Sequence, residues 1–147
     1  MKEKMQFLPR KDILTLEEIE RLCDNFIELG VEKIRLTGGE PLVRNDIIKL
    51  IEKLNIKKEK TNLKEITLTT NGTLLKKYAK LLKLNGINRI NVSLDTINPE
   101  KYNKITRFGN IEKVFDGINE ALDNNIKIKI NTVVIKYFNE NEIEELI

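Results

Sequence analysis

The stretch EKIRLTGGEP, residues 32–41, contains the two features that decide the fold. Ile34 and Leu36 alternate with polar residues, as in a strand whose successive side chains point to opposite faces. Two glycines follow directly after Thr37, and glycines at a strand end let the backbone approach a ligand closely. The other interpretation of this segment is an ordinary Gly-Gly turn. Residues 32–37 are therefore a predicted strand that ends in a candidate binding loop.

The same pattern of alternation followed by a polar turn recurs along the chain. Further strands are predicted at residues 65–69, 87–94 and 126–135, the last being the longest, and residues 55–64 read as a polar loop. Amphipathic helices are predicted after caps at Thr15, Asn45 or Asp46, Asn98, Asn110 and Asn139, and from Leu74 to near Gly86. Alternating helices and strands indicate parallel strands joined by right-handed crossovers, an α/β fold.

Helical spacing predicts which helix side chains face the core. They are Leu16, Ile19, Leu22, Cys23, Phe26 and Ile27 in the first helix, Leu74, Leu75, Tyr78, Leu81 and Leu82 in the third, and Ile111, Val114, Phe115, Ile118 and Leu122 after Asn110. Cys23 lies among apolar residues and is expected to be a buried core thiol.

All four predicted strands present one apolar and one polar face, whereas strands buried on both faces usually read as unbroken apolar runs. One interpretation is a curved sheet or barrel with a polar interior that could hold a charged ligand. The other is an open sheet with one solvated face.

Composition narrows the possible functions. Lys and Arg number 26 and Asp and Glu number 23, so the 147-residue chain has a formal net charge of +3, and the interleaved charges argue against a nucleic-acid partner. No apolar run is long enough to cross a bilayer, and the first twelve residues lack the apolar core of a secretory signal, so we expect a cytoplasmic protein without a membrane partner. A single cysteine excludes an internal disulfide and a cysteine-only metal site, and the absence of histidine removes the commonest metal ligand and general base.

Two more motifs stand at predicted strand ends, Thr69-Thr70-Asn71-Gly72 and Val92-Ser93-Leu94-Asp95. Together with the glycine loop they resemble the radical S-adenosylmethionine (SAM) superfamily. The closer resemblance is to the GTP 3′,8-cyclase family of molybdenum cofactor biosynthesis. It is carried by IRLTGGEPLVR (34–44), LTTNG (68–72), RINVSLD (89–95) and FLPRKDILTLEEI (7–19). Each motif alone is weak, whereas the set is specific.

The resemblance implies a fold and a reaction. The fold is a partial (β/α) TIM-like radical SAM barrel, in which this chain supplies about four parallel strands, the second to fifth of six, with flanking helices. The reaction is a lyase step that converts GTP to (8S)-3′,8-cyclo-7,8-dihydroguanosine 5′-triphosphate. The implied cofactors are SAM and a [4Fe-4S] cluster, and the implied small-molecule partners are GTP and SAM.

Site residues follow from the matching positions. The resemblance assigns Gly38, Gly39, Glu40 and Ser93 to SAM, and Arg35, Thr69 and Lys129 to GTP. It assigns no residue of this chain to catalysis or to a metal.

The chain also departs from the family pattern. The family holds its cluster with three cysteines spaced CxxxCxxC, just before the region that corresponds to residues 1–14, and this chain has only Cys23. We therefore expect residues 1–147 to form a single incomplete radical SAM core domain that is inactive alone. A complementing chain that carries the cluster is a further possible partner.

Three functions remain open at this point. The first is a truncated or split cyclase, and the second is a non-catalytic module that binds a nucleotide or SAM. The third is a fragment of another radical SAM subfamily, against which Arg35 and Lys129 argue because they suit a triphosphate.

Overall fold

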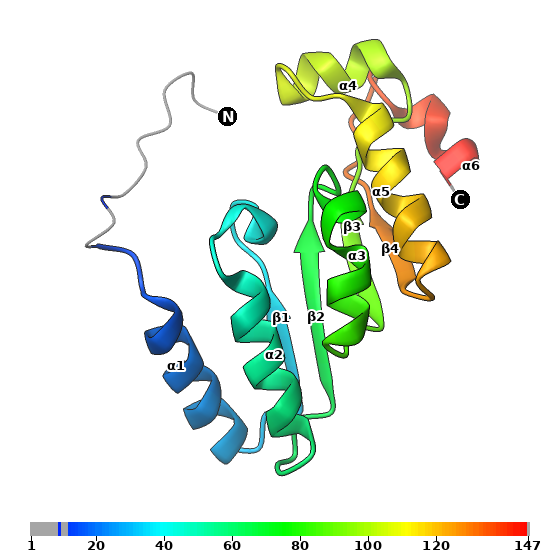
Figure 1. Cartoon of the computed structure of the whole chain (residues 1–147). Helices are drawn as coiled ribbons and strands as arrows, with labels where there is room; N and C mark the ends of the chain where they lie inside the picture. The colour runs from blue at the N-terminus through cyan, green and yellow to red at the C-terminus, as the bar shows by residue number, and fades with distance from the viewer. Residues whose placement is uncertain (1–8, 10–11, 147) are drawn as a thin grey trace.

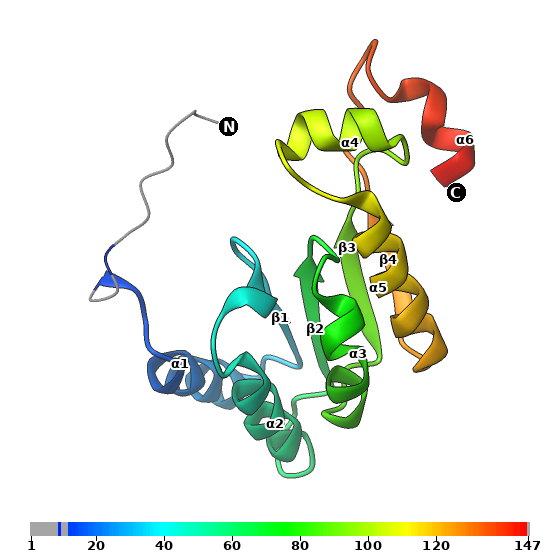
Figure 2. The ribbon, with the colours of Figure 1, turned by 45° about the horizontal axis from the view of Figure 1, so that its top comes forward.

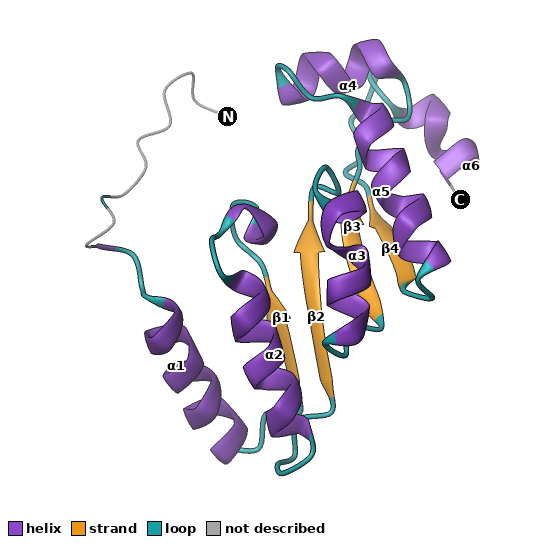
Figure 3. Ribbon diagram, in the orientation of Figure 1, coloured by secondary structure: helices purple, strands orange, loops and turns teal. Residues whose placement is uncertain are grey.

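The computed structural model describes residue 9 and residues 12–146, and it is an α/β structure of parallel strands and flanking helices (Figure 3). The strands are β1 (Lys33–Leu36), β2 (Glu65–Thr70), β3 (Arg89–Ser93) and β4 (Lys127–Asn131). The helices are α1 (Leu16–Glu28), α2 (Ile47–Lys58), α3 (Leu75–Leu84), α4 (Pro99–Thr106), α5 (Ile111–Asp123) and α6 (Ile143–Leu146), with short 3₁₀ helices η2 (Pro41–Val43) and η3 (Glu140–Glu142). The strand order β1-β2-β3-β4, parallel throughout, confirms the predicted fold class.

The sheet and its helices form two layers. Helices α2, α3 and α5 lie against one face of the sheet, and α1 packs beside α2 (Figure 1). Helices α4 and α6 lie beyond the carboxyl ends of the strands (Figure 2). Within the described residues β1 and β4 each pair on one side only, so the sheet is open. An open parallel sheet with its helices on one face is the arrangement expected of part of a (β/α) barrel.

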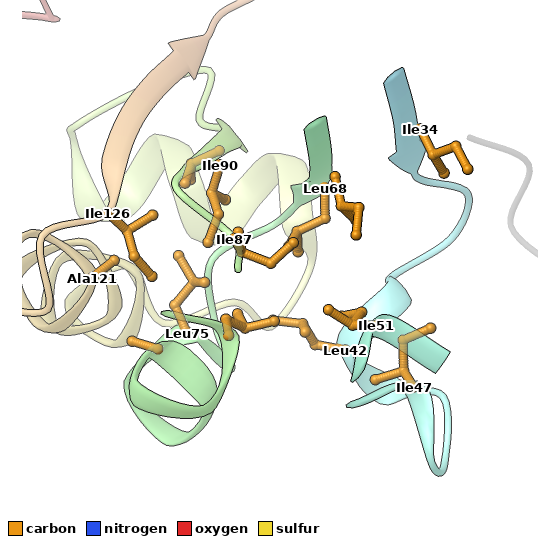
Figure 4. Close-up of a cluster of buried hydrophobic side chains, with 14 of the residues drawn as sticks. Ile34, Leu42, Ile47, Ile51, Leu68, Leu75, Ile87, Ile90, Ala121 and Ile126 are labelled. Carbon is orange, nitrogen blue, oxygen red and sulfur yellow. The ribbon is translucent and has the colours of Figure 1, made fainter. Parts of the chain in front are cut away.

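The hydrophobic core fills the space between these two layers (Figure 4). Ile34, Leu68 and Ile90 point from the strands toward the helices, where they meet side chains such as Ile51 and Leu75. All five are buried. Since burying one such side chain stabilises the fold by about 1.5–3 kcal/mol, this packing fixes which face of the sheet stays free.

The predicted inward faces of the helices are too wide. Leu22 and Phe26 of α1 are 41% and 50% exposed, whereas Cys23 and Ile27 are buried as predicted. The predictions for α3 and α5 are wrong in the same way, because Leu81, Phe115 and Leu122 are exposed. Helical periodicity identifies an apolar stripe, but only its centre contacts the sheet in the described structure.

Several predicted boundaries also differ. Helix α2 continues to Lys58, because its Lys-rich last turns are good helix formers that need no burial, so only residues 59–64 remain outside regular structure. Strand β4 covers five residues and β2 six, so residues 126–135 do not form the longest strand. The last helical segment starts as the 3₁₀ helix η3 and continues as α6. No helix in residues 12–146 is long and apolar enough to span a bilayer.

Three of the five predicted helix caps are confirmed by side-chain hydrogen bonds, whereas Asn139 and Asp46 make no capping bond. Thr15 and Glu18 form a reciprocal capping box, in which the Thr15 hydroxyl accepts from Glu18 N–H at 3.1 Å. Asn98 and Asn110 cap α4 and α5 through their side-chain oxygens. Asp46 precedes α2 but has φ 59° and makes no capping bond, so its carboxylate does not start the helix as predicted.

Replacing Gly117 of α5 by alanine is expected to destabilise the fold by about 1–2 kcal/mol. An added Cβ would lie 2.5 Å from the carbonyl oxygen of Gly72 and 2.8 Å from Cβ of Leu75. Alanine gains about 1 kcal/mol of helix propensity, but both contacts are shorter than 3.0 Å, so overpacking costs about 2–3 kcal/mol, the upper part of its usual range. Urea unfolding measures the difference. The control is Asn119→Ala on the exposed side of α5, and a Gly117→Ala protein as stable as this control would contradict the prediction.

Candidate functional site

The predicted site residues that belong to strands lie on the face of the sheet opposite α2, α3 and α5. Because side chains alternate along a strand, Arg35, Thr69, Ser93 and Lys129 all project to this side. We call this the polar face, formed by the polar residues of the four strands: Lys33, Arg35, Glu65, Thr67, Thr69, Arg89, Asn91, Ser93, Lys127, Lys129 and Asn131.

The strand register sets how these residues neighbour one another. Thr69 pairs with Asn91, and Asn91 pairs with Lys129, so these residues form a lateral row across three strands. Ser93 lies next along β3, beside Asn131. Arg35 pairs with Thr67 and belongs to β1, the edge strand opposite β4. Strands β1 and β4 are three strand spacings, or about 14 Å, apart. Thr69 and Lys129 are thus brought together, whereas Arg35 must reach across the face with its long side chain.

The polar face carries uncompensated positive charge. Glu65 binds both Lys33 (2.7 Å) and Arg89 (3.0 Å), and these two cations, Lys33 foremost, lower the pKa of the Glu65 carboxyl. The side chains of Arg35, Lys127 and Lys129 are exposed and have no hydrogen-bond or ion-pair partner in the described part of the chain. A surface with three such cations beside hydroxyl groups is suited to bind an anionic group such as a phosphate.

The loop after β1 is open and tightly turned. Gly38 has φ 97° and Gly39 has φ 32°, both in the region that favours glycine. A Cβ built at either residue would meet no atom within 4 Å, so the space above this backbone is free. The predicted strand-end binding loop therefore has the backbone shape and the access that ligand binding requires.

Glu40 is held by this loop and by the next one. Its Oε1 accepts from Leu42 N–H (3.0 Å) and from the Thr70 hydroxyl (2.8 Å). Its Oε2 accepts from Asn71 N–H at 2.7 Å. A carboxylate offers about four acceptor positions, so these three bonds leave one for a ligand. The Glu40 carboxylate therefore joins the loops at the ends of β1 and β2 through contacts within the chain alone.

Side-chain hydrogen bonds within the segment hold the Thr69–Gly72 turn in place. The Thr70 hydroxyl accepts from Gly72 N–H at 3.1 Å while it donates to Glu40. The Asn71 side-chain oxygen accepts from the N–H and the hydroxyl of Thr73. These bonds make the segment more than a plain Asn-Gly turn, because Thr70 and Asn71 also bind Glu40 of the glycine loop.

Cys23 does not fit an iron–sulfur cluster. It is the single cysteine of the sequence, it lies buried in α1, and burial raises the pKa of its thiol. A [4Fe-4S] cluster needs several exposed thiolates at one place. The prediction of a buried core thiol is confirmed, and residues 12–146 contain no group of three or more metal-ligating side chains.

Two residues of the site were not predicted to take part in it. Thr70 faces the helices and carries the bond to Glu40, which a period-two pattern cannot show. Alternation alone places Asn91 on the polar face and gives it no further role, whereas the structure shows that it is 3% exposed and that its Oδ1 has no hydrogen-bond partner among the described residues. The alternation in Asn91-Val92-Ser93 was the available signal, because it places Asn91 on the same face as Ser93.

Curated proteins named GTP 3′,8-cyclase are similar to this chain along nearly all of its length. The protein of Sinorhizobium medicae is 56% identical over 146 residues, which are 99% of this chain and 42% of that protein. The protein of Brucella ovis is 55% identical over 147 residues, 100% of this chain and 43% of that protein. The chain thus spans less than half the length of the curated relatives it matches.

Solved structures of anSMEcpe share the fold. The native anSMEcpe with bound AdoMet superposes with a TM-score of 0.67 at 25% identity over 83% of this chain and 35% of that one. The complex of native anSMEcpe with AdoMet and the Kp18Cys peptide gives 0.63 at 25% identity over 80% of this chain and 34% of that one. The sequence profile of the radical SAM superfamily matches residues 2–147, and with that match the chain belongs to the radical SAM superfamily.

Proposed function

We propose that this chain is the nucleotide-binding part of a radical SAM GTP 3′,8-cyclase. In this role it binds GTP and SAM on the polar face and at the adjoining strand ends. The single observation that carries the proposal is the pair of unpartnered cations, Arg35 and Lys129, on the face that also holds Thr69. The similarity to curated GTP 3′,8-cyclases along the whole chain supports it.

The triphosphate would lie between Arg35 and Lys129. Arginine binds phosphate through two parallel N–H groups, and lysine through one compact charge on a flexible stem. Thr69, in the same lateral row as Lys129, adds a hydroxyl that can donate to phosphate or accept from sugar. These residues bind and orient the nucleotide, and none of them acts as an acid or base.

SAM would lie at the ends of β1 and β3. The open backbone of Gly38 and Gly39 and the remaining acceptor position of Glu40 suit the methionine part, whose ammonium group needs acceptors. Ser93 is exposed at the end of β3 and offers a hydroxyl to the same ligand. In this family SAM supplies hydrogen-abstracting radical chemistry, and the protein's task is to position and shield it.

We further propose that residues 1–147 are an incomplete core domain, with residues 1–14 as a segment that follows a cluster loop. The cluster thiolates would then come from other sequence, for which a complementing chain is one source. No catalytic step is assigned to residues of this chain. The proposed location is the cytoplasm.

Replacing Lys129 by alanine is expected to weaken GTP binding about tenfold or more, and replacing Arg35 should act similarly. A charge-assisted hydrogen bond is worth about 1.5–3 kcal/mol, and 1.4 kcal/mol corresponds to tenfold. Isothermal titration of the purified chain with GTP at low salt measures the dissociation constants. Since the contacts are ionic, the loss should shrink as salt is raised.

The matched control is Lys113→Ala on the exposed side of α5, which removes the same charge far from the polar face. Its affinity for GTP should equal that of the unchanged chain. Equal affinities of the Lys129→Ala and Lys113→Ala proteins, or no GTP binding by the unchanged chain, would refute the proposed GTP site. A parallel SAM titration tests the other site independently.

A further inference from the structure

The polar face contains two buried atoms with unmet hydrogen-bonding capacity. Among the described residues, Nε of Arg89 and Oδ1 of Asn91 are the buried side-chain nitrogen and oxygen atoms without a hydrogen-bond partner. Both belong to β3, two residues apart, and therefore lie on the same face of the sheet. Buried polar atoms are nearly always paired in folded proteins, so two neighbouring exceptions require an explanation.

Burial alone does not produce such exceptions here. Thr67 lies on the same face and is fully buried, yet its hydroxyl donates to the carbonyl oxygen of Arg89 at 2.7 Å. The face can therefore satisfy a buried polar group when its role is structural. Asn91, in the middle of the row between Thr69 and Lys129, is left unsatisfied.

The chemistry of the two atoms defines the missing group. Arg89 Nε carries a hydrogen and must donate, whereas Asn91 Oδ1 must accept. A phosphate oxygen can only accept and an ammonium group can only donate, but a hydroxyl does both. The two residues are about 7 Å apart along the strand. Two hydrogen bonds of about 2.8–3.0 Å that meet at one oxygen atom cover most of this distance.

We propose that Asn91 is a further ligand-binding residue, whose Oδ1 accepts a hydrogen bond from a ribose hydroxyl of the bound nucleoside triphosphate. Arg89 Nε–H donates to the same oxygen. The inference rests on the proposed function, because Lys129 beside Asn91 would hold the phosphates to which that ribose is attached. Lys129 has a flexible, exposed side chain that can move toward phosphate and give the sugar access to Asn91.

The test compares GTP with 2′-deoxy-GTP and 3′-deoxy-GTP on the unchanged chain and on Asn91→Leu, which keeps the side-chain volume and removes the amide. The unchanged chain should bind one of the two analogues about tenfold more weakly than GTP, the loss expected for one buried hydrogen bond. The Asn91→Leu protein should bind GTP and that analogue equally. The control Thr67→Val should keep the preference for the hydroxyl.

Thermal unfolding without nucleotide separates a binding role from a structural one. Removing an unsatisfied buried amide should raise the melting temperature of Asn91→Leu by about 3 °C, whereas Thr67→Val, which loses a made bond, should melt lower. Should the leucine variant fail to fold, Asn91→Ala serves for the titrations.

The proposal is overturned if Asn91→Leu keeps the hydroxyl preference, which would mean that an ordered water bridges the two atoms. It is also overturned if the unchanged chain binds GTP and both analogues alike, or if Asn91→Leu melts lower without ligand. In each of these cases GTP binding persists and the proposed function stands. Absence of GTP binding by the unchanged chain would remove both.

Discussion

Replacing Glu40 by alanine should lower the free energy of unfolding by about 4–5 kcal/mol and abolish measurable SAM binding. The change removes the acceptor for Leu42 N–H, Asn71 N–H and the Thr70 hydroxyl. Hydrogen bonds to a charged group contribute about 1.5–3 kcal/mol each, and because Glu40 is only partly buried, its three bonds lie near the lower limit. Without the carboxylate the two loops are no longer joined. Urea unfolding and a SAM titration measure the two effects.

Two variants separate the hydrogen bonds from a general loss of charge. Glu40→Gln keeps the shape and one acceptor oxygen, so its stability should fall between those of the unchanged and alanine proteins. Glu32→Ala removes an exposed carboxylate that forms an ion pair with Lys64, at 2.6 Å, and should cost less than about 1 kcal/mol. If Glu40→Ala and Glu32→Ala unfolded at the same urea concentration, the joined-loop description would be wrong.

The sheet and its polar face were predictable from the sequence because they depend on local patterns. Ile34 and Leu36 alternate with Arg35 and Thr37, and a period of two fixes the face of each side chain once one face is buried. Parallel pairing followed from the order of helices and strands. The buried faces of the helices were less predictable, because the exposure of Leu22 and Phe26 depends on what packs against α1. No local sequence pattern encodes that packing.

The site was predictable as a set of residues but not as a set of contacts. The bond between Glu40 and Thr70 joins residues thirty positions apart and depends on how β1 and β2 end side by side. The row of Thr69, Asn91 and Lys129 depends on the register of three strands, which alternation leaves undetermined. Asn91 could be placed on the polar face from sequence, but its unmet hydrogen bond follows only from the packing of its neighbours.

The Glu142 carboxylate in η3 is expected to contribute about 3 kcal/mol to the free energy of unfolding at pH 6. Lowering the pH from 6 to 3 should remove about 2 kcal/mol of this contribution. Burial raises the pKa of this carboxyl, but hydrogen bonds from Lys101 Nζ (2.6 Å), the Thr96 hydroxyl (2.5 Å) and Ile97 N–H (2.9 Å) outweigh burial and hold it at about 2. The unfolded value is 4.5, and one unit corresponds to about 1.4 kcal/mol.

The sign follows from the lowered pKa. A carboxyl that binds its proton more weakly when folded stabilises the fold fully above pH 5, and this stability is lost as the pH falls from about 4.5 toward 2. Urea unfolding of the unchanged chain and of Glu142→Gln at pH 6 and pH 3 isolates the group, because the other carboxyls titrate alike in both proteins. The difference in stability between the two should shrink from about 3 to about 1 kcal/mol. A difference that stays constant over this range would mean that Glu142 holds the start of α4 by shape and not by charge.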